Sequence, residues 1–180
     1  MGALVKADKR AEPATVAEMQ QYLTFTLGGE MFAVGTLIVK EIIEYGQLTV
    51  VPMMPNFIRG VINLRGAVVP VIDLGARFGR AETAVTRRTC IVIIEVPSDD
   101  GRHDIGVVVD AVSEVREIPA SEIEPPPAFG AKIRADFIQG MGKVGGKFVI
   151  LLDVGKVLSV DEIATLAGVG GQGTTQVVAA

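Results

Sequence analysis

The sequence has very little of the side-chain chemistry from which metal sites and covalent catalytic centres are built. Its 180 residues include one cysteine, Cys90, one histidine, His103, and no tryptophan. A lone histidine without a cysteine cluster argues against a zinc site, and one cysteine cannot cross-link its own chain. The serines are few and scattered and suggest no nucleophile–base–acid set. We therefore expect no catalytic centre, no metal and no cofactor, and a reducing cytoplasmic environment.

Long apolar runs and clustered basic charge are also missing. No apolar stretch approaches the roughly 20 residues needed to cross a bilayer, and residues 1–21 lack the apolar core of a signal peptide. Lys and Arg number 17 against 21 Asp and Glu, and the only basic pair in the body, Arg87-Arg88, is too short for a nucleic-acid footprint. The sequence therefore predicts neither a nucleic-acid partner nor direct membrane insertion.

What the sequence does contain is a β-strand pattern. Hydrophobic residues make up 49% of the chain, and near the start Leu23, Phe25 and Leu27 alternate with polar neighbours, as in a half-buried strand. Gly28-Gly29 and Arg65-Gly66 are typical of hairpin turns. The predicted strands are 22–27, 31–34, 39–45, 48–51, 61–64, 67–74, 89–96, 103–109, 112–118, 138–144 and 147–154. Many short strands separated by Gly and Pro favour barrels or a sandwich, and hence a mainly β fold.

Helix is scarce, and the two ends differ from the rest in composition. One turn is predicted at 75–78, and a short C-terminal helix capped by Ser159 or Asp161. Residues 1–20 and 167–180 have too little apolar content to offset the entropy of ordering and are predicted to be flexible tails. A single folded region over 21–166 remains between them, with loops at 98–102 and 124–134.

An internal repeat divides this region into two similar halves. The stretch from Phe57 to Leu74 matches the stretch from Phe137 to Val154 in its Phe, Ile, Gly, Val and terminal Asp residues, at a constant offset of 80 positions. A weaker match pairs Val39-Lys40-Glu41-Ile42 with Val112-Ser113-Glu114-Val115. Chance similarity among Val-rich strands is the alternative, but agreement in spacing, turn glycines and aspartates favours two β-units related by a pseudo-twofold, with a groove at their junction.

Four segments resemble the CheW family of chemotaxis coupling proteins. They are Val51-Pro52-Met53-Met54-Pro55-Asn56-Phe57-Ile58-Arg59-Gly60-Val61-Ile62-Asn63-Leu64-Arg65-Gly66, Val68-Val69-Pro70-Val71-Ile72-Asp73-Leu74, Gly106-Val107-Val108-Val109-Asp110-Ala111-Val112 and Gly140-Met141-Gly142. The resemblance extends over about residues 21–166. It implies two intertwined five-stranded SH3-like barrels. It also implies a non-catalytic adaptor, recruited from the cytoplasm to membrane-associated receptor arrays, that links chemoreceptors to the histidine kinase CheA.

The resemblance also implies a receptor-binding surface. It would receive the tip of the receptor's cytoplasmic helical hairpin and comprise Arg65, Val39, Glu41, Gly60, Gly106 and Val112. A hairpin-tip arginine can anchor a carboxylate or backbone carbonyls of a partner helix, although Arg65 can equally be a solvated turn residue. Val39 and Val112 can be ordinary core, and the two glycines can serve close backbone approach. Asn63 is interpreted as a turn-stabilising residue.

A second surface, for the regulatory domain of CheA, is implied at Phe129, Glu124, Cys90 and Val92. Phe129 follows a triple proline, which would present an aromatic anchor on a stiff support. Glu124 stands where some relatives carry arginine, so this sequence departs from the family pattern at that position by a reversed charge. Cys90 and Val92 belong to an apolar strand for which a buried core position is the simpler interpretation.

Two other functions are compatible with the sequence. A small β-barrel could bind a ligand, which would require a polar, convergent pocket. The same fold could instead connect receptors and kinases of another pathway, such as one controlling type IV pili.

Overall fold

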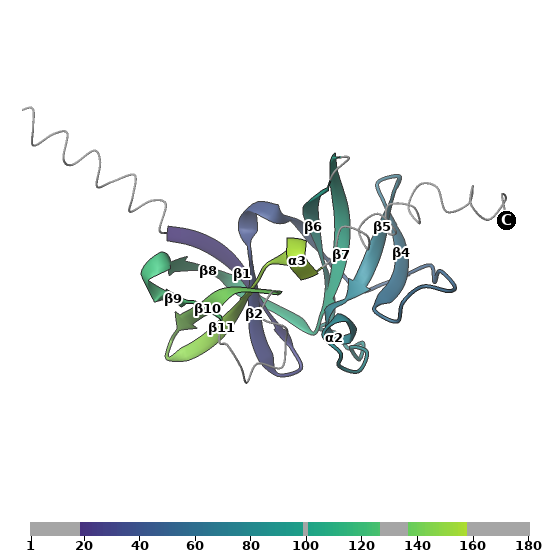
Figure 1. Cartoon of the computed structure of the whole chain (residues 1–180). Helices are drawn as coiled ribbons and strands as arrows, with labels where there is room; N and C mark the ends of the chain where they lie inside the picture. Colours follow the sequence, from purple (N-terminus) through teal and green to yellow (C-terminus); the bar gives the residue numbers. More distant parts are fainter. Residues whose placement is uncertain (1–18, 99–100, 127–136, 158–180) are drawn as a thin grey trace, which may run out of the picture.

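A computed structural model describes residues 19–98, 101–126 and 137–157 of the chain. Strands dominate these ranges (Figure 1). They are β1 (Met19–Leu27), β2 (Glu30–Gly35), β3 (Val39–Glu44), β4 (Ile58–Leu64), β5 (Ala67–Asp73), β6 (Cys90–Ser98), β7 (Gly101–Val109), β8 (Ala111–Pro119), β9 (Ile123–Glu124), β10 (Ile138–Val144) and β11 (Lys147–Leu152). The helical segments are η1 (Thr36–Ile38), α2 (Leu74–Arg77), η2 (Ala120–Glu122) and α3 (Val154–Val157).

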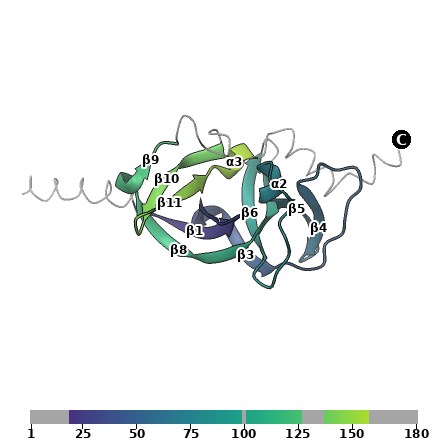
Figure 2. The same ribbon diagram turned by 90° about the horizontal axis from the view of Figure 1, so that it is seen from below.

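The strands form two sheets that share the chain in an interleaved way. Sheet A has the order β8-β1-β2-β11-β10-β9, and sheet B has the order β3-β6-β7-β5-β4. The chain starts in sheet A, crosses to build all of sheet B, and returns to complete sheet A, so the two units lie side by side in Figures 1 and 2. The predicted mainly β fold of two intertwined units is therefore confirmed, with two-residue β9 as an additional edge strand.

The strand orders show that the sequence repeat is a structural repeat. Strands β3, β6, β7, β5 and β4 of sheet B occupy the places of β8, β1, β2, β11 and β10 in sheet A. Both hairpins of the repeat carry the same irregularity, a register shift between Ile58 and Gly60 and between Ile138 and Gly140. Each sheet also contains one parallel pair at the matching place, β5 with β7 and β11 with β2. The matched registers establish the pseudo-twofold.

Three apolar clusters correspond to the junction of the two sheets and to the inside of each. The largest, which we call the shared core, takes side chains from both sheets, including Phe25 and Phe32 of sheet A and Val92 and Ile94 of sheet B. A second cluster around Val71 and Ile93 fills the concave side of sheet B, and a third around Tyr22 and Leu151 fills that of sheet A. The shared core explains why neither unit is an independent domain, since each buries one face against the other.

Arg77 lies where the two halves meet. Its guanidinium carbon is 5.1 Å from the ring centre of Phe57 and 5.2 Å from that of Phe137, which are equivalent residues of the repeat. Its Nε donates to the carbonyl of Val157, the residue equivalent to Arg77 itself. One arginine thus bridges two symmetric aromatic rings by cation–π contacts, which single residues near a pseudo-twofold can do.

Several predicted boundaries are wrong for identifiable reasons. Residues 48–51 form no strand, only an isolated bridge from Thr49 to Val61, because the prolines that follow stop the ladder. The strand predicted to reach Leu74 ends at Asp73, whose carboxylate accepts a hydrogen bond from Ala76 N–H and caps α2. Strand β7 begins inside the predicted loop 98–102, and β9 ends at the first residue of the predicted loop 124–134. Strand β1 begins three residues before the predicted strand 22–27, within the predicted tail. The predicted helix after Ser159 lies outside the described residues, as do nearly all of the predicted tails.

The predicted hairpin turns are confirmed. Gly28-Gly29 and Arg65-Gly66 each connect paired strands through two residues with positive φ, the geometry that matches strand twist in tight hairpins. Gly145-Gly146 forms the equivalent turn in the second half. The Asn63 side chain accepts a hydrogen bond from Gly66 N–H at 2.9 Å, which confirms its role in the turn.

Candidate partner-binding surface

The predicted receptor-binding residues Arg65 and Glu41 lie together. Arg65 Nη2 is 2.5 Å from Glu41 Oε1. Glu41 lies on β3 and Arg65 just beyond β4, and these strands are the two edges of sheet B. The ion pair therefore joins the edges of a sheet that has curled into a barrel. The pair lies at the barrel mouth, where the Arg65 side chain remains 74% exposed.

Backbone geometry, rather than packing, positions Arg65. Its φ of 53° is in the left-handed region that non-glycine residues seldom adopt. The tight turn and the Asn63 hydrogen bond hold it there. Because the guanidinium has five N–H donors and Glu41 occupies only part of them, Arg65 can bind a second acceptor without leaving Glu41.

Gly60 and Gly106 share one lateral row of sheet B with Glu41. The row runs Gly60, Val71, Gly106, Ile93, Glu41 across all five strands. A Cβ at Gly106 would lie 2.7 Å from Ile91 Cγ2, and one at Gly60 would lie 2.4 Å from the carbonyl oxygen of Thr49. Both glycines are buried, so their direct role is to let backbone and core side chains approach inside the barrel.

Val39 and Val112 are equivalent residues at the edges of the two sheets. Both are half-buried and pack against the shared core. Three positions along each strand, Ile42 and Val115 are 42% and 52% exposed. Sequence reasoning missed these two as surface residues, although the weak repeat that pairs Val39 to Ile42 with Val112 to Val115 already contained the signal. The two strands thus present matched apolar pairs, one from each unit.

The residues predicted for the kinase surface are not brought together in one cluster. Glu124 on β9 pairs with Lys143 on β10 at 2.8 Å, and the hydrogen bond to Glu124 raises the pKa of Lys143. Cys90 is half-buried at the start of β6, with its Sγ 3.3 Å from the carbonyl oxygen of Arg88. Val92 is fully buried in the shared core, so it can affect a surface only through packing. Phe129 lies outside the described residues.

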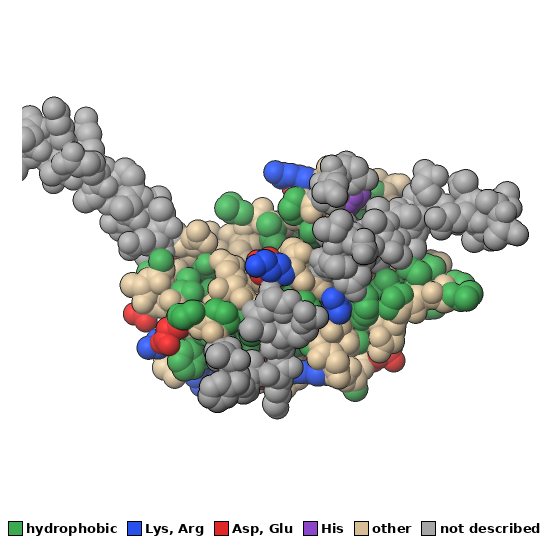
Figure 3. All heavy atoms as spheres, viewed as in Figure 1, with side chains coloured by type: hydrophobic (Ala, Val, Ile, Leu, Met, Phe, Trp, Pro, Cys, Tyr) green, Lys and Arg blue, Asp and Glu red, His purple; other side chains and the backbone are tan. Residues whose placement is uncertain are grey.

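The face of the molecule drawn in Figure 3 is neither predominantly acidic nor predominantly basic. Figure 3 shows acidic and basic side chains scattered over this face rather than gathered into a basic stripe. Within the described ranges, no group of three or more His, Cys, Asp or Glu residues could hold a metal ion. Over the same ranges, no helix has the length and apolar character needed to cross a membrane.

These features define a small, mainly β protein of two pseudo-twofold-related barrels. The chain belongs to the CheW-like domain family, since the model of that family matches residues 21–162. It is 37% identical to the chemotaxis protein CheW of Klebsiella aerogenes over 150 residues, which cover 83% of this chain and 88% of that protein. It is also 32% identical to the protein FrzA of Myxococcus xanthus over 154 residues, covering 84% and 93% of the two chains.

A solved structure agrees with both the fold and the family. The crystal structure of the scaffolding protein TtCheW from Thermoanaerobacter tengcongensis superposes with a TM-score of 0.71 at 33% sequence identity, covering 79% of this chain and 90% of that one. The resemblance inferred from the sequence segments is thereby confirmed.

Proposed function

We propose that this protein is a non-catalytic cytoplasmic adaptor that couples chemoreceptors to a CheA-type histidine kinase within membrane-associated arrays. Membership of the CheW-like family and similarity to a scaffolding protein support this role. The observation that carries the receptor half of the proposal is the pairing of Arg65 with Glu41 at the barrel mouth of sheet B. The adaptor acts by position, because it fixes the geometry of two partners and carries out no reaction.

The receptor partner is the tip of a cytoplasmic helical hairpin. An amphipathic helix binds a groove through apolar anchors and a few polar contacts. Val39 with Ile42 and Val112 with Val115 offer the apolar contacts. Arg65 offers the polar contact, since it is exposed and already oriented by Glu41. Gly60 and Gly106 support this surface from inside by keeping the strands of sheet B close together.

The kinase partner is the regulatory domain of CheA, which has the same fold as this family. Glu124, Cys90 and Phe129 are the proposed contact residues, with Val92 behind them in the core. Glu124 pairs with Lys143 in the free protein. To bind the kinase, Glu124 must therefore either accept a kinase contact while it stays paired with Lys143, or leave Lys143 for a cationic residue of the kinase. An interface of this transient kind depends on a few anchors, so one altered residue should affect one partner and spare the other.

Receptor binding can be tested with Arg65→Ala and a closely matched control. Arg102 has nearly the same exposure, 73% against 74%, and also pairs with a single glutamate, Glu95, at 2.8 Å. Arg65→Ala should lower affinity for a receptor hairpin at least tenfold, about 1.4 kcal/mol, while Arg102→Ala leaves it unchanged. Affinity can be measured by calorimetry with purified receptor cytoplasmic fragments. Equal affinities for all three proteins would contradict the receptor surface proposed here.

The kinase surface needs a separate variant. Phe129→Ala should reduce binding to the isolated regulatory domain of CheA and leave receptor binding intact. Phe148→Ala is the control, because Phe148 is a half-exposed phenylalanine on β11. If Phe129→Ala behaved like Phe148→Ala in both assays, Phe129 would not be a kinase anchor.

An adaptor of the same mechanism could belong to a pathway other than chemotaxis. The chain is similar to FrzA of Myxococcus xanthus as well as to proteins named CheW, and this similarity supports considering a pathway other than chemotaxis. Binding of receptors and kinases from each candidate system would distinguish the pathways.

A further inference from the structure

Strand β3 contains one extra residue relative to its neighbour β6. Val39 pairs with Ile94 and Glu41 pairs with Ile93, so Lys40 has no residue of its own opposite it. Such a β-bulge changes which face of the sheet the following side chains occupy, because successive side chains alternate between the two faces. The bulge therefore lies between two residues of the candidate receptor-binding surface, Val39 and Glu41.

The bulge places these two residues on different faces of sheet B. Val39 packs against the shared core. Glu41 pairs with Ile93, which belongs to the cluster on the concave side of sheet B. Without the extra residue Glu41 would lie opposite Val92, a residue of the shared core, and would face away from the barrel mouth. The ion pair of Glu41 with Arg65 therefore depends on the bulge.

Sheet A has an equivalent bulge in β8, which a threonine of β1 stabilises. The register of β8 shifts by one residue opposite Thr24, a fully buried side chain. The Thr24 hydroxyl donates to the carbonyl oxygen of Glu114 at 2.7 Å and accepts from the N–H of Glu114 at 3.1 Å. The registers of the two sheets align Thr24 with Ile93. An isoleucine side chain has no polar atom, so sheet B lacks this means of holding its bulge.

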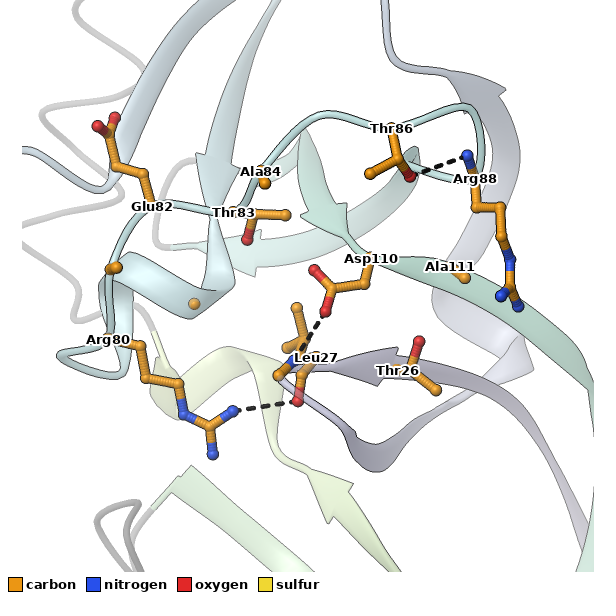
Figure 4. A pocket seen from close by; sticks show the side chains of 13 residues that line it. Thr26, Leu27, Arg80, Glu82, Thr83, Ala84, Thr86, Arg88, Asp110 and Ala111 are labelled. Carbon is orange, nitrogen blue, oxygen red and sulfur yellow. Dashed lines mark hydrogen bonds between the residues drawn. The ribbon is translucent and has the colours of Figure 1, made fainter.

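The start of β8 has a second anchor in sheet A. In the cleft drawn in Figure 4, the Asp110 carboxylate accepts a hydrogen bond from the N–H of Gly28 at 2.8 Å. The same registers align Asp110 with Leu37 and Gly28 with Pro97. The Leu37 side chain has no acceptor, and Pro97 has no N–H. Sheet B must therefore hold its bulge by other contacts.

Those contacts are ion pairs of the bulged lysine itself. Lys40 Nζ lies 3.1 Å and 3.2 Å from the two carboxylate oxygens of Asp104, and 3.9 Å from Glu95 Oε2. Glu95 on β6 pairs with Asp104 on β7, so the carboxylates come from two neighbouring strands. Their side chains are 30% and 31% exposed, so water screens this cluster less than a fully exposed pair. In sheet A the residue at the place of Lys40 is Ser113, which has no charge.

We propose that Lys40 is a positioning residue of the receptor-binding surface. Its ion pairs with Asp104 and Glu95 hold the bulge against β6 and β7. The bulge in turn directs Glu41 toward Arg65, and Arg65 makes the contact with the receptor. Lys40 itself does not touch the receptor. This inference rests on the proposed function, because it concerns the same binding surface.

A double-mutant cycle on receptor affinity tests the positioning role in the full chain. Lys40→Met removes the charge, keeps a long side chain, and should lower affinity for a purified receptor cytoplasmic fragment about threefold. In an Arg65→Ala background the same change should have no further effect, because Lys40 acts through Arg65. Lys40→Arg should retain most of the affinity, and Asp104→Asn should resemble Lys40→Met. Calorimetry measures all of these affinities.

Lys143→Met is the matched control. Lys143 is 49% exposed against 46% for Lys40 and also pairs with a carboxylate, but it lies in a regular part of its strand, opposite Phe148. Lys143→Met should leave receptor affinity unchanged. Equal affinities of the Lys40→Met and Lys143→Met proteins would overturn the inference. An equal loss with and without Arg65 would also overturn it, because Lys40 would then contact the receptor directly.

Amide exchange in the free protein separates this inference from the proposed function. Lys40→Met should raise exchange several-fold at the amides of residues 39–43, because the bulge is no longer held against β6 and β7. Lys143→Met should leave exchange at these amides unchanged. Indistinguishable exchange in the two proteins would overturn the inference without any receptor in the assay. If exchange rises as expected but the unmodified chain binds no receptor fragment, the proposed function is contradicted and the role of Lys40 in the bulge is supported.

Discussion

The two halves of the molecule have the same strand order but use polar residues differently. In sheet B, Asp73 is fully buried and accepts hydrogen bonds from Thr83, Ala76 N–H and Arg59 Nε, the last at 3.0 Å. In sheet A the equivalent Asp153 is partly exposed. Arg59 is replaced there by the exposed Gln139. The comparison shows that the fold itself does not require the buried network, so the network must serve sheet B alone.

The network ties together the segments that surround the Arg65 side of the molecule. Arg59 joins Asp73 to Tyr45, whose hydroxyl accepts from Arg59 Nη1 at 3.1 Å and whose ring lies 5.5 Å from the guanidinium carbon. It thereby links the end of β3 with β4, β5 and the 79–89 loop. Sheet A has no arginine at the place of Arg65, where Gly145 stands instead. The half with the candidate receptor residue is thus the half with the stronger internal support.

The largest expected effect is on stability, from breaking this network. Asp73→Ala should lower the free energy of unfolding by about 3–5 kcal/mol, because it leaves the Arg59 guanidinium without its buried partner. Asp153→Ala should cost about 1 kcal/mol or less. Urea unfolding of both variants measures the difference. Similar losses would mean that the two aspartates are equivalent despite their different surroundings.

The next largest effect concerns the inside of the barrels. Gly106 in sheet B corresponds to Ala33 in sheet A, so only one half has room for a Cβ at this place. Gly106→Val should lower the free energy of unfolding by about 1–3 kcal/mol through overpacking against Ile91. Gly35→Ala is the control, since a Cβ there has no neighbour within 4 Å. A Gly106→Val protein as stable as the control would show that the barrel of sheet B can expand.

A smaller effect is expected from making the two hairpin turns alike. Arg65→Gly creates the Gly-Gly turn of the second half and removes a left-handed arginine, so stability should stay constant or rise by about 1 kcal/mol. Receptor affinity should fall as for Arg65→Ala. The reverse change, Gly145→Arg, should reduce stability by a similar amount and create no receptor binding. Thermal unfolding and calorimetry test both; a loss of stability in Arg65→Gly would contradict the assignment of strain to this turn.

The smallest effect concerns the ion pair between Lys143 and Glu124 at the β9 edge of sheet A. The hydrogen bond and charge of Glu124 raise the pKa of Lys143 above its ordinary value of 10.5. Because the folded-state pKa of Lys143 is raised, the ion pair contributes to the free energy of unfolding at pH values below the unfolded-state pKa. That contribution is lost as the pH rises through the folded-state pKa. Glu124→Gln should lower the pKa of Lys143 in an NMR titration, whereas Glu44→Gln on sheet B should not. An unchanged pKa in Glu124→Gln would show that the pair does not form in solution.

Much of the fold was predictable because short-range rules determine it. Alternating apolar residues located most strands, and the glycine turns set the hairpin connections. The repeat predicted the pseudo-twofold, which register matching confirms. Residues 48–51 and β9 were mispredicted because they pair over one or two residues at a sheet edge, where tertiary contact rather than local pattern decides strand formation.

The site was only partly predictable, since side-chain partners are distant in sequence. Nothing local indicates that Arg65 pairs with Glu41 across the two edges of sheet B, or that Arg59 Nη2 donates a hydrogen bond to the carbonyl oxygen of Thr83. Sequence analysis assigned Arg65 and Gly106 to one receptor-binding surface, but in the structure Arg65 is exposed and Gly106 is buried. The exposure of Ile42 and Val115 also depends on the packing of both edge strands, which one sequence does not specify.

Co-sedimentation with receptor-containing membranes, with and without a CheA-type kinase, tests the central claim most directly. We expect the purified protein to sediment with the membranes and the kinase to be retained only when this protein is present. Arg65→Ala should abolish both, while Phe129→Ala should keep the protein on the membranes and release the kinase. A protein that stays in the supernatant with its cognate receptors and kinase, or kinase retention that does not depend on it, would contradict the adaptor role.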